Sequence, residues 1–138
     1  MNLATQLLEI EGLGARWSLG DYESELNNPD SRSYFYRGDQ GELRGFVLFR
    51  EFPDGLEIMN LAVRFKGQGW GRHLFMGYLE SLKNNDLVIK PLELRLEVDA
   101  ENAAAIALYK KSGFEEVFRR PKYYKNGSDA LLMKLIIK

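Results

Sequence analysis

The sequence contains no cysteine and only one histidine, His73. Without thiols there can be no disulfide bond, no zinc–thiolate site and no cysteine nucleophile. No cluster of residues with metal-ligand spacing is visible, so we expect no metal. His73 lies in an amphipathic stretch that follows a glycine-rich segment, where a structural or exposed place suits it better than the role of a base.

An excess of one charge and long apolar runs are missing as well. Nineteen Lys and Arg stand against twenty Asp and Glu, which leaves no basic surplus for nucleic acid. No apolar run approaches the ~20 residues of a membrane span. Residues 1–14 carry no basic side chain, unlike a signal peptide. We therefore expect one domain over residues 1–138, located in the cytoplasm, with neither nucleic acid nor a membrane as partner.

What the chain does contain is a concentrated glycine motif. Gly67, Gly69 and Gly71 alternate between an apolar run over residues 56–63 and an amphipathic stretch over residues 73–82. This order is typical of a strand, a turn and a helix. Glycine lets the backbone curl around a ligand, and the first N–H groups of a helix lack intrahelical partners. The motif therefore predicts a site for a phosphate or pyrophosphate, or else only a tight turn between strand and helix.

Two familiar phosphate motifs do not fit this segment. A Walker A loop would end in Gly-Lys-Ser/Thr, whereas Gly71-Arg72-His73 stands here. The dinucleotide fingerprint needs the glycine spacing G-x-G-x-x-G, whereas the spacing here is G-x-G-x-G.

Hydrophobic periodicity predicts a mixed α/β domain. Short helices are expected from Leu3 to a glycine-flanked end at Gly12-Leu13-Gly14, and over 19–26 with Ser18 as N-cap. Apolar residues alternate with Glu and Arg over 92–98, which is the period of a strand. The segment from 56 to 98 is predicted to form a right-handed parallel strand–helix–strand unit. The other expected elements are strands over 33–37, 45–52, 114–119 and 130–137, and a helix from Asn102 to Gly113.

The segment that follows residue 95 resembles a known family signature. Leu96-Glu97-Val98, Asn102 at a helix start, Tyr109 near its end and then Gly113-Phe114 resemble the second signature of the GCN5-related N-acetyltransferases (GNAT). The stretch Lys66-Gly67-Gln68-Gly69-Trp70-Gly71 then resembles the family's acetyl-CoA loop, Gln/Arg-x-x-Gly-x-Gly/Ala. A register that begins at Arg64 also fits. The resemblance covers about residues 15–138.

This resemblance implies a fold and a cosubstrate. The fold is a mostly antiparallel mixed sheet with a central parallel βαβ unit that binds acetyl-CoA. The family's strand before the first helix is expected to be absent, because this chain begins too close to that helix. The residues implied in acetyl-CoA binding are the end of the strand before the loop, the loop itself and the start of the later helix: Leu61, Ala62, Val63, Lys66, Gly67, Gln68, Gly69, Trp70, Gly71, Arg72 and Asn102.

Two residues are the candidates for proton transfer. Glu97 stands on the polar face of its predicted strand and is the candidate base; the alternative is a solvated face. Tyr109 is the candidate acid, because a phenol of pKa ~10 stays protonated at neutral pH and can donate to a thiolate of pKa ~8.5. The alternative for Tyr109 is packing in the core.

Several short stretches are most similar to the ribosomal-protein-alanine N-acetyltransferase (RimI-like) subgroup. They include Asn60-Leu61-Ala62-Val63, Trp17-Ser18 and Arg119-Arg120-Pro121-Lys122-Tyr123-Tyr124. In that subgroup a Glu accepts and a Tyr donates the proton, which matches Glu97 and Tyr109. Trp17, Tyr123 and Tyr124 become candidates for the acceptor groove, or else pack as ordinary aromatics. The stretch between Val63 and Lys66 is two residues shorter than the usual linker.

The acceptor implied by this subgroup is the N-terminal α-amine of a protein. Two other acceptors remain open, a small-molecule amine and a lysine side chain. A module that binds acyl-CoA without turnover is a further alternative, against which the set Glu97, Asn102 and Tyr109 argues.

Overall fold

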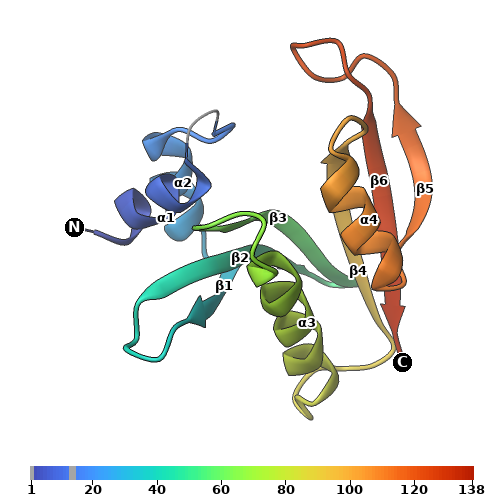
Figure 1. Ribbon diagram of the computed structural model, residues 1–138. Helices are drawn as coiled ribbons and strands as arrows, with labels where there is room; N and C mark the ends of the chain where they lie inside the picture. The colour runs from blue at the N-terminus through green and yellow to red at the C-terminus, as the bar shows by residue number, and fades with distance from the viewer. Residues whose placement is uncertain (1, 13–14) are drawn as a thin grey trace.

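The fold is a single six-stranded sheet with helices on both faces, seen in a computed structural model that describes residues 2–12 and 15–138 (Figure 1). The strand order is β1-β2-β3-β4-β6-β5. The elements of the described part are α1 (Leu3–Glu11), α2 (Leu19–Leu26), β1 (Ser31–Arg37), β2 (Leu43–Phe52), β3 (Gly55–Val63), α3 (Trp70–Lys83), β4 (Leu92–Asp99), α4 (Ala103–Lys111), β5 (Glu115–Arg120) and β6 (Ala130–Ile137).

The sheet is antiparallel except between β3 and β4, which are parallel and are connected through α3. The mostly antiparallel sheet with a central parallel βαβ unit is therefore confirmed. In the described residues the first element is α1, and β1 forms one edge of the sheet. The fold thus lacks a strand before its first helix within that part of the chain, as predicted.

Local signals account for the helix ends. Ser18 and Asp21 form a capping box at the start of α2, with each side chain accepting from the other's backbone N–H. Asn2 caps α1, and Gly12, at φ +82°, ends it. The other two residues of the predicted helix end, Leu13 and Gly14, lie outside the described part.

Two hydrophobic clusters hold the sheet, one on each face. On one face α3 contributes Phe75 and Tyr78 to a cluster with Val47 of β2 and Leu94 of β4. On the other face α1 and α2 pack against β1–β3, with Leu7, Ile10 and Tyr22 over Phe46 and Leu48. Along β4 the apolar residues are buried and Glu97 is exposed, as the alternation predicts.

One boundary differs from the prediction in a way that concerns the site. Helix α3 begins at Trp70, three residues before the predicted amphipathic stretch. Gly69 is its N-cap and adopts φ +78°, a conformation that glycine enters without the usual steric penalty. Trp70, Gly71 and Arg72 are therefore residues of the first helical turn rather than of a loop. None of the helices in the described residues is both long and apolar enough to cross a membrane.

Candidate active site

The central feature of the site is the separation of β3 from β4. These strands pair only from Gly55 with Glu93 to Ile58 with Leu96. At that point the register between β2 and β3 shifts, so that Met59 is an extra residue in β3, as in a β-bulge. Beyond the bulge β3 runs on to Val63 without pairing to β4 (Figure 1). Backbone groups on that side of β3 are left for an extended ligand.

A cavity of about 880 Å³ lies where the two strands separate. It brings together most of the residues that the sequence singled out, although they come from distant parts of the chain. The predicted residues that line it are Trp17, Leu61, Ala62, Val63, Lys66, Gly71, Arg72, Glu97, Asn102, Tyr109, Tyr123 and Tyr124. Gly67, Gln68, Gly69 and Trp70 are not among its lining residues.

The glycine segment has the properties of an anion site. Gly67 and Gly69 adopt φ angles of +79° and +78°, and a Cβ added at either position would have no heavy atom from beyond its chain neighbours within 4 Å. No side chain caps the start of α3, and its first turn contains no acidic residue. The N–H groups of the first turn, together with the helix dipole, therefore favour a negatively charged group there. Lys66 and Arg72 are exposed cations beside it.

Trp70 differs from its neighbours in this segment, because its side chain is structural. The indole packs against Phe65 and Tyr36, at ring-centroid distances of 5.4 Å and 6.2 Å. The guanidinium of Arg44 lies 4.7 Å above it. Trp70 can therefore contribute its backbone N–H to a ligand at the helix start, while its side chain is used in packing.

Helix α4 supplies Tyr109 and Asn102. Tyr109 is 6% exposed, and its ring packs on Phe75 and Phe114 at 5.3 Å and 5.9 Å. Burial raises the pKa of Tyr109 well above its usual value, so the phenol stays protonated and has a proton to donate. Asn102 is the N-cap of α4, and its Oδ1 accepts from the N–H of Ala105 at 3.2 Å. The side-chain NH₂ of Asn102 remains for a ligand.

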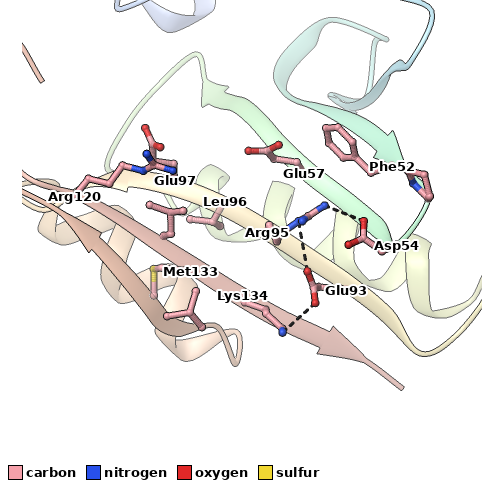
Figure 2. A pocket seen from close by; sticks show the side chains of 13 residues that line it. Phe52, Asp54, Glu57, Glu93, Arg95, Leu96, Glu97, Arg120, Met133 and Lys134 are labelled. Atoms are coloured by element: carbon pink, nitrogen blue, oxygen red, sulfur yellow. Dashed lines mark hydrogen bonds and ion pairs between the residues drawn. The ribbon is translucent and has the colours of Figure 1, made fainter. Parts of the chain in front are cut away.

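Glu97 stands on the exposed face of β4, and a second cavity of about 600 Å³ begins at the same residue. Figure 2 shows Glu97 and Glu57 rising from the same side of the sheet. Farther along, Arg95 pairs with Asp54 at 3.2 Å, and Lys134 pairs with Glu93 at 3.0 Å. Glu57, Leu96 and Glu97 line both cavities, so Glu97 lies where the two meet.

Tyr124, in the loop between β5 and β6, contacts Glu97 directly. Its hydroxyl donates to Oε1 of Glu97 at 3.1 Å. Burial, with the nearby charge of Glu97 as a second cause, raises the pKa of Tyr124 to about 12. Tyr123, by contrast, is 54% exposed and stacks edge-on against Tyr124. Of the two predicted groove tyrosines, Tyr124 is therefore the one that touches the candidate base.

The sequence offered no signal for Arg16 and Asp99, which meet in this cavity. Arg16 precedes α2 and forms an ion pair with Asp99 at the end of β4. The same guanidinium lies 4.0 Å from the ring centroid of Tyr124. The pKa of Asp99 is lowered, mainly by the N–H of Glu101 and further by Ser128 and Arg16. Eighty-three positions separate Arg16 from Asp99, so no local pattern could reveal the pair.

Trp17 lines the cavity, and its side chain is held in place by packing against Tyr22. Its ring lies 5.1 Å from that of Tyr22, which is fully buried. The hydroxyl of Tyr22 donates to Glu11 and accepts from Asn60 of β3 at 3.0 Å. This chain of contacts ties the loop before α2 to the unpaired part of β3, so the predicted groove residue Trp17 has a defined place in the cavity wall.

The groups that meet here suit acyl transfer. They are a carboxylate, a buried phenol, unpaired backbone of β3 and an anion site. In residues 2–12 and 15–138 there is no group of three or more acidic or histidine side chains that could hold a metal ion. His73 is exposed on α3 and is not among the lining residues of the cavity.

Comparison with known proteins agrees with this chemistry. Residues 3–114 match the model of the acetyltransferase (GNAT) family. A putative ribosomal protein bS18-alanine N-acetyltransferase of Bacillus subtilis is 31% identical over 133 residues, which cover 94% of this chain and 85% of that protein. The ribosomal protein bS18-alanine N-acetyltransferase of Escherichia coli K12 is 32% identical over 126 residues, covering 88% and 81%.

A solved structure is similar over almost the whole chain. The crystal structure of the ribosomal-protein-S18-alanine N-acetyltransferase from Escherichia coli superposes with a TM-score of 0.83 at 29% identity. The match covers 98% of this chain and 88% of that one.

Proposed function

Because this chain belongs to the acetyltransferase (GNAT) family and is an acetyl-CoA-dependent N-acetyltransferase, we propose that its acceptor is the α-amine at the N-terminus of a protein. The Escherichia coli relative is named a ribosomal protein bS18-alanine N-acetyltransferase, and a protein that begins with a small residue such as Ala is the acceptor we infer here. The reaction would take place in the cytoplasm. The acceptor amine would attack the thioester of acetyl-CoA directly, within a ternary complex of the enzyme, acetyl-CoA and the acceptor.

Acetyl-CoA supplies the activated acetyl group, and three parts of the chain fit it. We propose that the first-turn N–H groups of α3, with Lys66, Gly67, Gln68, Gly69, Trp70, Gly71 and Arg72, bind the pyrophosphate. This fits the open glycine turn, the uncapped helix start and the exposed cations. The unpaired backbone of Leu61, Ala62 and Val63 would bind the pantetheine arm in the manner of an added strand. The free NH₂ of Asn102 would contact the coenzyme from α4.

The acceptor amine has to lose a proton before or during its attack. We propose Glu97 as the proton acceptor, directly or through one water. An α-amine of pKa ~8 is about one-tenth neutral at pH 7, whereas a lysine amine of pKa ~10.4 is neutral in less than one part in a thousand. An exposed carboxylate is a weak base. It therefore suits the α-amine better than the lysine side chain.

The departing thiolate benefits from a proton, and Tyr109 is proposed to give it. The observation that carries the proposal is that Glu97 and Tyr109 line one cavity at the unpaired end of β3. An acceptor amine and a thioester that meet there have a base and an acid within the same space. A backbone N–H of β3 would stabilise the negative charge that develops on the carbonyl oxygen.

Trp17, Tyr123 and Tyr124 are proposed to border the acceptor groove. They come from the loop before α2 and from the β5–β6 loop, and all line the cavity. The groove meets the second cavity at Glu97, so an acceptor longer than one residue has room to continue along the sheet (Figure 2). That continuity favours a peptide over a small amine.

The test is acetyl-CoA turnover, measured as thiol release, with hexapeptides that have free N-termini and with a panel of polyamines and lysine peptides. Turnover with Ala- or Ser-starting peptides, abolished by N-terminal blocking, is the expected result. Turnover confined to small amines or to lysine side chains would refute the proposed acceptor while the family chemistry stands. Binding of acetyl-CoA with no turnover on any acceptor would refute catalysis as proposed.

A further inference from the structure

A chain of contacts leads from the loop before α2 to the candidate base. Arg16 is held by Asp99, its guanidinium lies over the ring of Tyr124, and the hydroxyl of Tyr124 donates to Glu97. We propose that Arg16, anchored by Asp99, is a positioning residue that fixes Tyr124 and thereby the orientation of the carboxylate of Glu97. The inference rests on the proposed role of Glu97 as base.

The geometry supports a positioning role because each contact restrains a different element. Asp99 ends β4, two residues after Glu97, and its side chain is only 9% exposed, so the ion pair sets the end point of the Arg16 side chain. Asp99 is itself held by the N–H of Glu101 at 2.9 Å. A guanidinium 4.0 Å from a ring centroid is within the range of a favourable cation–π contact. The ring of Tyr124 is therefore held from a rigid point.

The β5–β6 loop is also restrained at its C-terminal end, by contacts of Asp129 just before β6. Asp129 accepts from the N–H of Lys122 at 3.0 Å and from Arg119 at 2.9 Å. The carbonyl of Asp129 accepts from Ala100 at 2.9 Å, next to Asp99. The loop backbone is thus fixed to the end of β4, while Arg16 fixes the side chain of Tyr124.

The consequence for Glu97 is geometric, because the hydroxyl of Tyr124 donates to Oε1 of Glu97 at 3.1 Å and so orients the carboxylate. Because the pKa of Tyr124 is raised, the phenol keeps its proton across the working pH range. The other charged groups that line this junction are Glu57 of β3, Arg95 of β4, Arg120 of β5 and Lys134 of β6. Arg95 and Lys134 pair with other acidic side chains at 3.0–3.5 Å. Glu97 instead receives a hydrogen bond from the hydroxyl of Tyr124.

The experiment is a double-mutant cycle with Arg16→Met and Tyr124→Phe, read as kcat and KM for one Ala-starting hexapeptide at pH 7 and saturating acetyl-CoA. Methionine keeps an apolar stem beside the ring but removes the guanidinium. Phenylalanine keeps the ring under Arg16 but removes the donor to Glu97. The same peptide at the same pH is used for every variant, so differences between variants report the protein.

Each single variant is expected to lower kcat/KM at pH 7 by about tenfold, the low end for one hydrogen bond to a charged group. The loss should fall mainly on kcat rather than on the KM of the peptide, because a misoriented carboxylate slows proton removal from an amine that is already bound. In the Tyr124→Phe background, Arg16→Met should add little, since both act on the same hydroxyl. The affinity for acetyl-CoA should stay within twofold throughout.

Two controls keep the outcome clear. Arg32→Met removes an exposed arginine on β1 that pairs with Glu51 at 3.5 Å, and it should leave kcat and KM unchanged. Arg16→Lys retains a cation for Asp99 and should restore part of the loss, which also covers the case in which Arg16→Met folds poorly. Effects of Arg16→Met and Tyr124→Phe that simply multiply, or a raised peptide KM with an unchanged kcat, would overturn the inference.

The result for Glu97 separates this inference from the proposed function. If Glu97→Gln keeps wild-type activity, the base assignment fails and the positioning role fails with it. If Glu97→Gln is inactive while the cycle is additive, only the positioning role is overturned.

Discussion

Replacing Tyr109 by Phe is the sharpest test of the proposed chemistry, because the structure separates its effect on activity from its effect on the fold. The ring contacts with Phe75 and Phe114 do not involve the hydroxyl. Phenylalanine keeps both contacts and removes only the hydroxyl of this cavity-lining residue. The free energy of unfolding should therefore change by no more than about 1 kcal/mol, the scale of one hydrogen bond.

The expected loss of activity is much larger. General acid catalysis contributes about 10²- to 10⁴-fold, which corresponds to roughly 3–5 kcal/mol of transition-state stabilisation. Burial raises the pKa of Tyr109, so the phenol is protonated at every pH at which the enzyme works. The loss in kcat should therefore be nearly the same at pH 6 and at pH 8.

The assay is thiol release with saturating peptide, together with acetyl-CoA affinity by calorimetry and the melting temperature. A matched control is Tyr78→Phe on α3. Tyr78 is also fully buried, its hydroxyl has no hydrogen-bond partner in the described part of the chain, and it does not line the cavity. That variant should retain full activity. If Tyr109→Phe stays within threefold of wild type, or loses activity only through weaker acetyl-CoA binding, the acid role is wrong.

Three further predictions follow from particular contacts. Gly69→Ala forces φ +78° on a residue with a Cβ, so we expect about 1 kcal/mol of lost stability in thermal unfolding and weaker acetyl-CoA binding; an unchanged Tm would contradict the strain. Arg50→Met leaves the buried carboxylate of Glu25 without its two hydrogen bonds from Arg50. Because solvent reaches Arg50, we expect the free energy of unfolding measured in urea to fall by about 2 kcal/mol, less than for a fully buried pair. The pKa values of Glu25 (mainly through Arg50), Asp99 (mainly through the N–H of Glu101) and Asp129 (mainly through the N–H of Lys122) are lowered in the fold. Their contribution to stability is therefore complete above their unfolded values near pH 4 and is lost as the pH falls below them, so a melting temperature unchanged from pH 5 to pH 2.5 would refute it.

Local patterns in the sequence were enough for most of the elements. The alternation over 92–98 sets which face of β4 is buried, and it correctly left Glu97 exposed. Ser18 and Asn102 start their helices because a short polar side chain accepts from a backbone N–H three residues on. Gly69 marks the start of α3, although the helix extends closer to it than the hydrophobic pattern suggested. These features depend on neighbours within one or two turns, so the chain itself specifies them.

The candidate site could be predicted only as separate pieces. The residues Glu97, Asn102 and Tyr109 were identified by resemblance, and the tertiary structure decided that they line one cavity with the end of β3. The separation of β3 from β4 depends on a register shift against a third strand, which no periodicity in β3 reveals. A pattern along one strand carries no information on the pairing of its neighbours.

The sequence by itself determined the family, the order of the elements and the residue types available for catalysis. Only the tertiary structure decided that Arg16 reaches Asp99 and Tyr124, and that Tyr124 rather than Tyr123 contacts Glu97. The physical reason is that local backbone preferences act over a few residues, whereas an ion pair or a ring contact joins whichever side chains the packing of the sheet and its loops brings together. Contacts across 27 and 83 positions follow from the fold, and a linear motif does not encode them.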